Sequence, residues 1–275
     1  MGFSRDARTA VHDRDYLLSA GKRDDVLALW EVQQYGRDSF GDPDYVTIYG
    51  LTPADWHARG IRLLARTAVE CTRDALADRI GRDIAAVAAA APASDPVVVD
   101  PFAGSANTLY WIARHVGARR AIGFELDDGV FDLTSRNLAI VNLDLTLSHV
   151  GHEAGLKAVR VRRDQLLIVF VAPPWGDALS QTAGLDLRRT QPPTPEIIDL
   201  IARTFPAHKV LLATQVYETV LPDSLTAVTS RCEWSSLEAY DLNAPGQNHG
   251  RMLGTLGWTP EQTLTGARGP LTVPR

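Results

Sequence analysis

Two short stretches of the chain combine acidic, small and rigid residues in a way that suits ligand binding. Residues 100–105 have the sequence Asp-Pro-Phe-Ala-Gly-Ser, and residues 172–176 have the sequence Ala-Pro-Pro-Trp-Gly. Each follows an apolar run typical of a buried parallel strand, at 97–99 and at 166–171. Because ligands bind at the carboxyl ends of the strands in open α/β sheets, we expect both stretches to line one pocket.

The residues of the first stretch indicate the kind of ligand. A turn of small residues after Asp100 lets the backbone approach a polar cofactor tail, and Gly104 is its one well-placed glycine. A dinucleotide-binding fold would have a second glycine where this chain has Ala106. Glu125, at the end of the next predicted strand, can accept both ribose hydroxyls of an adenosine group. These features favour S-adenosylmethionine (SAM), although Asp100 as a helix cap and Glu125 as a surface acid are the simpler alternatives.

The two stretches also resemble known motifs. Asp-Pro-Phe-Ala-Gly-Ser resembles the first motif of SAM-dependent amino-methyltransferases of DNA and RNA, and Ala-Pro-Pro-Trp-Gly resembles their fourth. With Leu-Asp-Leu-Arg at 185–188, the second stretch looks like the RNA cap guanine-N2 methyltransferase (trimethylguanosine synthase-like) family. The resemblance covers residues 97–215 and is more specific for fold and cofactor than for substrate. It implies cofactor contacts from Asp100, Phe102, Ala103, Gly104, Glu125 and Pro173, and a substrate platform from Trp175, Pro174 and Ala172.

Two positions depart from the family pattern. Family members carry an acid after the third strand that contacts the adenine amino group, and this chain has Gly151 and His152 there. The fourth motif usually begins with Asn, Asp or Ser, whose side chain accepts a hydrogen bond from the amine that is methylated. Ala172 has no such acceptor. The ring platform is therefore kept, but half of the amine clamp is missing.

The methyl acceptor must lose a proton in many methyl transfers, which requires a base with a pKa near the working pH. His249 is our candidate, because the connector between the last two predicted strands should lie at the ligand-binding edge. A solvent-exposed loop histidine is the alternative. Tyr110, in the first turn of the helix after Gly104, either points toward the methyl donor or packs in the core. Six aromatic residues before position 60 either form a lid over the pocket or anchor their segment: Trp30, Tyr35, Phe40, Tyr45, Tyr49 and Trp56.

Charge and composition bear on the partners. The chain has 28 Lys and Arg against 33 Asp and Glu, a net charge of -5. Proteins that bind nucleic acid usually have a basic face, and the one dense basic stretch here, 157–163, is typical of the solvated face of a connecting helix. No apolar run reaches the roughly 18 residues of a membrane span. Cys71 and Cys232 predict neither a disulfide framework nor a zinc site, so we expect a cytoplasmic protein without a metal.

The order of predicted elements indicates the fold. Residues 1–95 form a helical N-terminal extension or lid, with a helix beginning at Thr52 and Pro53 and another over 59–80. Residues 96–275 form the SAM-binding domain, with strands at 97–100, 121–126, 145–150, 166–172, 209–214, 233–242 and 251–258. Helices are expected at 106–116, 129–141, across the basic stretch and at 195–204. This order predicts a Rossmann-like class I methyltransferase fold: an α/β protein with a mostly parallel seven-stranded sheet and one reversed strand.

The function expected from these residues is methyl transfer from SAM to a small heteroaromatic, indole-like substrate, on a ring carbon or nitrogen, in specialised metabolism (natural product biosynthesis). His249 and Tyr110 would be the catalytic residues. The alternative is an RNA cap-type guanine-N2 methyltransferase, which the motif resemblance alone favours. A non-catalytic SAM-binding scaffold is disfavoured by the intact Pro-Pro-Trp turn. The sequence does not indicate an oligomeric state.

Overall fold

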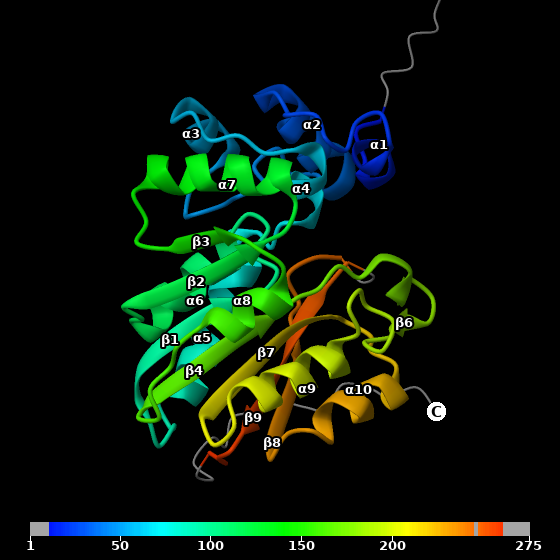
Figure 1. Cartoon of the computed structure of the whole chain (residues 1–275). Helices are drawn as coiled ribbons and strands as arrows, with labels where there is room; N and C mark the ends of the chain where they lie inside the picture. Colours follow the sequence, from blue (N-terminus) through cyan, green and yellow to red (C-terminus); the bar gives the residue numbers. More distant parts are fainter. Residues whose placement is uncertain (1–10, 245–246, 261–275) are drawn as a thin grey trace, which may run out of the picture.

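Seven strands form one sheet in the order β3-β2-β1-β4-β7-β9-β8. The computed structural model describes residues 11–244 and 247–260 (Figure 1). The strands are β1 (Ser94–Asp100), β2 (Arg120–Glu125), β3 (Thr146–His149), β4 (Gln165–Val171), β7 (Lys209–Tyr217), β8 (Trp234–Ala239) and β9 (His249–Leu256). The first five in this order pair in parallel, whereas β9 is antiparallel to both of its neighbours. This confirms the predicted Rossmann-like sheet with one reversed strand.

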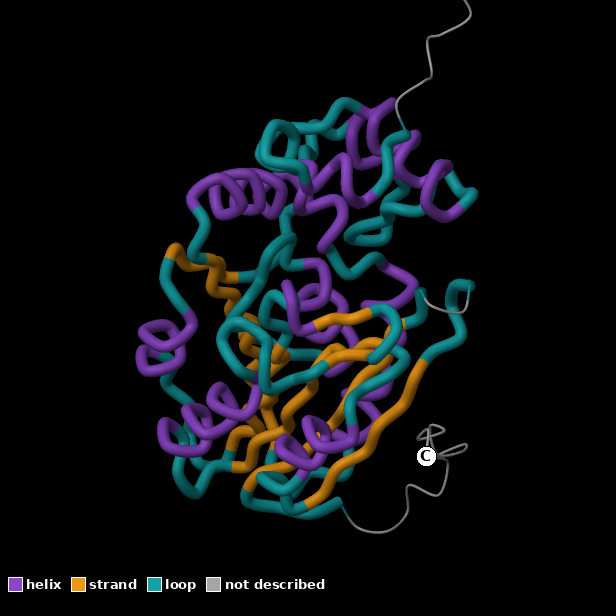
Figure 2. The backbone as a smooth tube through the Cα atoms, turned by 90° about the vertical axis from the view of Figure 1, so that its right-hand side faces the viewer, coloured by secondary structure: helices purple, strands orange, loops and turns teal. Residues whose placement is uncertain are grey.

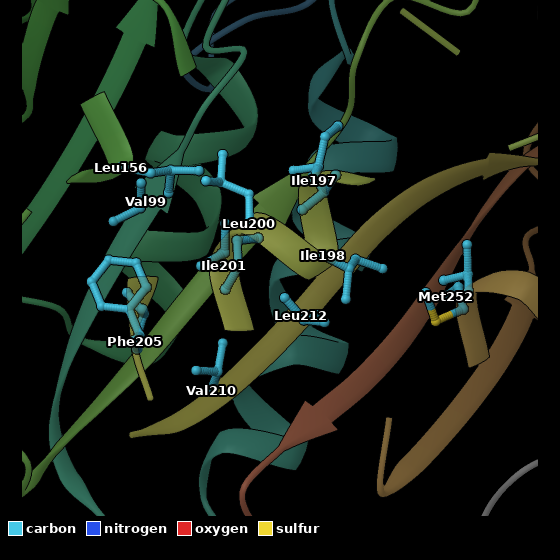
Figure 3. Close-up of a cluster of buried hydrophobic side chains, with 14 of the residues drawn as sticks. Val99, Leu156, Ile197, Ile198, Leu200, Ile201, Phe205, Val210, Leu212 and Met252 are labelled. Carbon is cyan, nitrogen blue, oxygen red and sulfur yellow. The ribbon is translucent and has the colours of Figure 1, made fainter. Parts of the chain in front are cut away.

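Helices cover both faces of the sheet, because the central strands are apolar on both sides. On one face lie α8 (His152–Ala158), α9 (Thr194–Thr204) and α10 (Pro222–Thr229). Figure 3 shows the resulting core, in which Ile198 and Ile201 of α9 lie near Leu212 of β7. On the other face lie α5 (Asp74–Ala88) and α6 (Asn107–Val116), which pack on β1 and β4 through a second apolar cluster.

The N-terminal segment lies over the carboxyl edge of the parallel strands (Figures 1 and 2). It contains α1 (Arg14–Leu18), α2 (Leu29–Phe40), α3 (Pro53–Ala58) and α4 (Ala65–Glu70), and α7 (Asp128–Val141) runs beside it. A third apolar core joins this segment to the sheet domain: Trp56 and Ile61 share it with Ala103, Ala106 and Leu138. The predicted helix start at Thr52 is confirmed, since its Oγ1 accepts a hydrogen bond from the Asp55 amide.

The helix predicted over 59–80 is wrong. Gly60 has φ +91° and follows α3, and the chain leaves α4 at Cys71 in an extended conformation before α5 begins. The extended conformation exposes the Thr72 carbonyl, which accepts a hydrogen bond from the Asn107 side chain of α6. Amphipathic spacing was correct for α5, but that helix packs on the sheet together with α6 rather than with the lid helices.

Three smaller differences concern the C-terminal half of the chain. The basic stretch is not a helix throughout, because α8 ends at Ala158. A short helix, α10, follows β7 and was not predicted. The loop after β4 adds a 3-10 turn (Gly176–Ala178) and the short strand pair β5 (Leu179–Ser180) and β6 (Gly184–Leu185), which continue from the Pro-Pro-Trp turn.

Candidate functional site

The loop after β1 is held tightly against β2. Asp100 is only 2% exposed, and its Oδ1 accepts the Phe102 amide at 3.0 Å. The Ala103 amide donates to the Phe124 carbonyl at 2.9 Å. This approach requires small residues on both sides, because a Cβ on Gly123 would lie 2.8 Å from the Cβ of Ala103. The small-residue turn predicted from the sequence therefore serves close packing of the loop on the sheet.

Glu125 accepts hydrogen bonds from the loop after β1 and from the loop after β2. Its Oε2 accepts the Gly104 amide at 3.0 Å, and its Oε1 accepts the Asp127 amide at 2.8 Å. Thr134 of α7 donates to the Gly104 carbonyl at 2.8 Å. A carboxylate offers about four lone-pair directions, so each oxygen of Glu125 can still accept one further hydrogen bond. We call residues 100–105 together with Glu125 the crevice.

There is open space beside Gly104 in the crevice. Gly104 has φ +50°, and a Cβ built on it would meet no atom within 4 Å. The Cα of Gly104 therefore faces open space rather than a packed neighbour. The amide and the carbonyl of Gly104 are already hydrogen-bonded, so what this region offers an adenosine-containing cofactor is the space beside Gly104 and the unused lone pairs of Glu125.

Asp100 has an unusual protonation equilibrium. Burial raises the pKa of Asp100 to about 7, and the negative charge of Glu125 adds to this effect, while the hydrogen bond from the Phe102 amide opposes it. Asp100 does not cap the helix that follows, since the residue that precedes α6 is Ala106, and no side chain caps that helix. The buried carboxyl is thus a structural part of the crevice floor.

Two aromatic rings and one leucine lie where the family pattern would place the adenine-binding acid. The ring of Phe102 stacks on His152, with centroids 5.2 Å apart and planes at 28°. Leu126, directly after Glu125, is 70% exposed and lies next to Gly151. An exposed leucine beside a half-buried ring pair offers an apolar wall for a flat ligand. The sequence indicated His152 here, but it gave no reason to select Leu126.

The second predicted stretch forms a rigid turn directly after β4. Pro173 is buried, Ala172 is half-buried and Pro174 is exposed. The Pro174 carbonyl accepts the Gln191 amide at 3.1 Å, which fixes the turn from its outer side. Trp175 is half-buried, and its ring centroid lies 5.2 Å from that of His249. The structure therefore brings Trp175 and His249 together, as the sequence predicted.

His249 is the first residue of β9 rather than part of the connector. Because β9 is antiparallel, its start lies at the same edge as the ends of the parallel strands, and His249 pairs with Tyr217 of β7. Burial lowers the pKa of His249 to about 4, and the positive charges of Arg73 and Arg14 add to the effect. The imidazole is therefore neutral at pH 7.

A hydrogen-bonded chain links His249 to the N-terminal segment. The Gln215 amide nitrogen lies 3.0 Å from His249 Nδ1, and Thr72 Oγ1 donates to Gln215 Oε1 at 2.6 Å. Thr72 and Gln215 were not predicted as site residues. The predicted strand ended at residue 214, whereas β7 extends through Gln215 to Tyr217.

A cavity of about 380 Å³ lies between the N-terminal segment and this edge of the sheet. His249, Gln215 and Tyr217 line it from the sheet side. Residues of the N-terminal segment that line it include Tyr35, Phe40, Tyr45, Glu70, Cys71, Thr72 and Arg73. The rings of Phe40 and Tyr45 are stacked with centroids 3.5 Å apart, and the Arg73 guanidinium lies over the Tyr45 ring at 4.2 Å. We call this space the cavity.

The cavity and the crevice are neighbours. Thr72 lines the cavity, and its carbonyl accepts from the Asn107 side chain at 2.7 Å, while the Asn107 amide donates to Ser105 Oγ in the loop after β1 at 3.4 Å. Glu70 also lines the cavity, where burial raises its pKa and the charges of Arg14, Arg23 and Arg66 oppose this effect. A ligand in each space would therefore lie close to the other.

The six predicted lid aromatics divide into three groups. Tyr35, Phe40 and Tyr45 line the cavity. Trp56 and Tyr49 anchor the segment instead: Trp56 is fully buried and donates Nε1 to the Val46 carbonyl. Trp30 is 58% exposed and lies away from the cavity lining.

Tyr110 is not placed with the other predicted catalytic residue. Its hydroxyl accepts a hydrogen bond from Arg114 one helical turn further along α6, and its ring contacts Tyr49 edge-on at 6.0 Å. It packs against the third apolar core and does not line the cavity. The ring of Tyr110 therefore packs against the third apolar core while its hydroxyl is at the surface beside Arg114, and a role of Tyr110 toward the methyl donor stays a prediction.

Neither a protein-family model nor a curated protein matches this chain. Among solved structures, it is similar to a delta-N METTL16 methyltransferase domain (TM-score 0.49, 12% identity, 84% of this chain and 98% of that one). A precorrin-6y methyltransferase from Geobacter metallireducens gives a TM-score of 0.44 at 15% identity over 67% of this chain and 89% of the other. A putative methyltransferase from Streptococcus mutans, in complex with S-adenosylhomocysteine (SAH), gives 0.42 at 16% identity over 65% and 97%. These similarities are weak, so the fold assignment depends on the strand order itself.

No helix within residues 11–244 and 247–260 is long and apolar enough to cross a membrane.

Proposed function

We propose that this chain is a SAM-dependent methyltransferase that methylates a ring carbon or nitrogen of a small heteroaromatic, indole-like substrate. The observation that carries the proposal is the adjacency of two differently built spaces. The crevice has the backbone turn and carboxylate that suit an adenosine cofactor. The cavity beside it has the flat rings and a neutral histidine that suit a planar substrate. Specialised metabolism is the proposed context.

The cofactor would be held by the crevice. Glu125 has lone pairs left for two ribose hydroxyls, and Gly104 leaves open space for the amino-acid tail. Phe102, Ala103 and Pro173 would supply the surrounding surface, and Leu126 and His152 would lie near the adenine ring of the cofactor. When bound, SAM supplies a methyl group on a positively charged sulfur, which is the electrophile of the reaction.

The substrate would lie in the cavity beside His249. Trp175 does not line the cavity itself, but its ring lies 5.2 Å from that of His249, so it would meet a substrate that extends past the histidine. Small-ligand sites are commonly about 300–1,000 Å³, so a cavity of about 380 Å³ suits a single small molecule. The aromatic side chains of Tyr35, Phe40 and Tyr45 give this lining its apolar surface, although Phe40 and Tyr45 stack on each other and Arg73 covers Tyr45. Enclosure of this kind would hold the ring in one orientation, and such positioning accounts for much of the catalytic effect in a displacement reaction.

His249 is the proposed base for a ring N–H. Its pKa of about 4 keeps the imidazole neutral at pH 7, with a lone pair on one ring nitrogen. This value also makes it a weaker base than one whose pKa lies near the working pH, so a bound substrate would have to raise the pKa of His249 for it to take the proton. Loss of the N–H proton leaves the electron pair in the ring, which makes the ring nitrogen and the conjugated carbon more nucleophilic. The proton would be held on His249 and released to water as the site opens.

Methylation of guanine in capped RNA is the alternative, and the distribution of charge disfavours it. The basic stretch lies at the amino ends of the strands, opposite the crevice: Arg162 pairs with Asp95 near the start of β1, and Arg120 donates to the Arg160 carbonyl at the start of β2. It therefore cannot guide an RNA backbone into the cavity. Ala172 also lacks the side-chain acceptor for an exocyclic amine.

The experiment that tests the proposal is methyl transfer from labelled SAM to indoles, and in parallel to guanosine and capped RNA. The proposal predicts label on the indoles at a rate that depends on Trp175. Label on the guanine amino group, with none on the indoles, would establish the alternative. No transfer to any acceptor, with SAH bound by calorimetry, would leave a SAM-binding protein and refute the substrate assignment.

A further inference from the structure

Gln215 lies between the proposed base and the N-terminal segment and contacts both. It is 8% exposed, so its side-chain amide has little access to bulk water. One end of the amide lies 3.0 Å from His249 Nδ1, and the other accepts from Thr72 Oγ1 at 2.6 Å. Burial makes each of these hydrogen bonds costly to lose, so the three side chains act as one unit.

The chemistry of the amide fixes the proton on the histidine. An amide nitrogen carries hydrogens and donates only, so the Nδ1 that faces Gln215 Nε2 must be the unprotonated, accepting nitrogen. In a neutral imidazole the proton is then on Nε2. Within the described residues Nε2 has no hydrogen-bond partner, so it is the nitrogen left for a substrate.

We propose that Gln215, anchored by Thr72, is a positioning residue that sets which ring nitrogen of His249 carries the proton. The catalytic consequence rests on the proposed function, whereas the tautomer itself is a property of the free protein. In the arrangement found here the N–H of His249, which lines the cavity, is on Nε2. In this resting form His249 can donate a hydrogen bond from Nε2 to a substrate ring atom that has a lone pair. Nε2 cannot accept a proton in this form.

Rotation of the amide by half a turn reverses the preference without losing a hydrogen bond. Gln215 Oε1 then accepts from Nδ1–H, and Gln215 Nε2 donates to Thr72 Oγ1, because a hydroxyl both donates and accepts. His249 Nε2 now has the lone pair needed to take a proton. A heteroaromatic ring with an N–H facing Nε2 therefore selects the turned form, which is the form that acts as a base.

Charged groups around the imidazole act on both forms. Arg73 and Arg14 disfavour a positive imidazolium, and Glu218 opposes them. Tyr217 contacts the ring edge-on at 6.2 Å. A permanent negative charge at position 215 would change this balance, which gives the proposal a direct test.

The test uses the full chain with nitrogen-15 labelled histidine and nuclear magnetic resonance at pH 7. His249 is assigned from the signal that disappears in His249→Gln. The wild-type protein is expected to show an unprotonated Nδ1 and a protonated Nε2. In Gln215→Glu the carboxylate can only accept, so the proton should move to Nδ1, and the titration of His249 should rise by about 1–3 pH units. The same tautomer and the same titration in both proteins would overturn the proposal.

Two further variants keep the test decisive. Thr72→Val removes the anchor without adding a charge, and the two nitrogen signals of His249 should move toward each other as both tautomers become populated. Gln181→Glu is the matched control, because Gln181 lines the same cavity but makes no hydrogen bond to His249 among the described residues; it should leave the tautomer unchanged. An unchanged spectrum in Thr72→Val, or a switched tautomer in Gln181→Glu, would contradict the assignment.

Failure of this inference and failure of the proposed function give different results. A tautomer that switches in Gln215→Glu, in a protein that methylates no heteroaromatic, would support the positioning role and refute the function. If the wild-type protein methylates indoles but the His249 tautomer is the same in Gln215→Glu, the proposed function is supported and the positioning role of Gln215 is refuted.

Discussion

The crevice and the cavity lie side by side, but they are built in different ways. The crevice comes from one loop and one nearby strand end, held together by backbone amides that donate to its two carboxylates. The cavity is formed by side chains from distant parts of the chain: Thr72 and Gln215 are 143 positions apart. A backbone-built site tolerates few changes of loop shape, whereas a site built from side chains can change its ligand by substitution. We infer that the crevice defines the reaction and the cavity defines the substrate.

The largest effect is expected in the cavity, from His249→Ala. Loss of a general base typically lowers kcat by about 10²–10⁴. Affinity for SAH should change little, because His249 does not belong to the crevice. Steady-state kinetics with an indole substrate and calorimetry with SAH measure the two quantities separately. His57→Ala, in α3, is the control, and equal losses in both variants would show that the effect is not catalytic.

In the crevice, Asp100→Asn should change how stability depends on pH. The pKa of Asp100 is raised to about 7 in the folded protein, so the folded state binds its proton more tightly than the unfolded state between about pH 4 and pH 7. Wild-type stability therefore falls as pH rises through this window, by at most about 4 kcal/mol. Urea unfolding at pH 5 and pH 8 should show a smaller difference in Asp100→Asn. Asp128→Asn, at an exposed acid, should behave like the wild type, and an identical pH dependence in all three proteins would contradict the burial argument.

A smaller effect is expected from a change at Trp175, which tests whether this ring contacts the substrate or the cofactor. Trp175→Ala should weaken transition-state binding of a flat substrate by about 1–3 kcal/mol, the scale measured for stacking of a base on an aromatic ring. Most of this should appear in kcat/KM, with SAH affinity retained. Trp30→Ala removes an exposed tryptophan that has no ring contact with His249 among the described residues, and it should have no effect. If Trp175→Ala lost SAH binding instead, the ring would be a wall of the crevice.

The two regions also differed in how far the sequence predicted them. Asp100, Gly104 and Glu125 were identified because a strand, a turn and a second strand end are local patterns with fixed consequences. His249 was expected at the right edge although it begins a strand, since either position lies at that edge. Leu126 was missed because an exposed leucine has no polar signature.

Other parts were decided by contacts that no local pattern records. The predicted helix over 59–80 ignored the Asn107 side chain, which needs the Thr72 carbonyl and the Asp74 carboxylate as acceptors and so requires an extended connection there. Gln215 was missed because its role depends on contacts with Thr72 and His249, which are far from it in the sequence. Tyr110 sits at the expected helix position, but its side chain packs away from the cavity.

The central claim is that the crevice binds an adenosine cofactor through Glu125, and calorimetric titration of SAH tests it most directly. The wild-type protein should bind SAH, and Glu125→Ala should weaken binding by about 1–3 kcal/mol, the scale of hydrogen bonds to a charged group. Glu125→Gln keeps one acceptor oxygen and should fall between the two, while Glu153→Ala, at an exposed acid of α8, should bind like the wild type. A folded Glu125→Ala protein with unchanged SAH affinity, or a wild-type protein that binds no SAH, would contradict the claim.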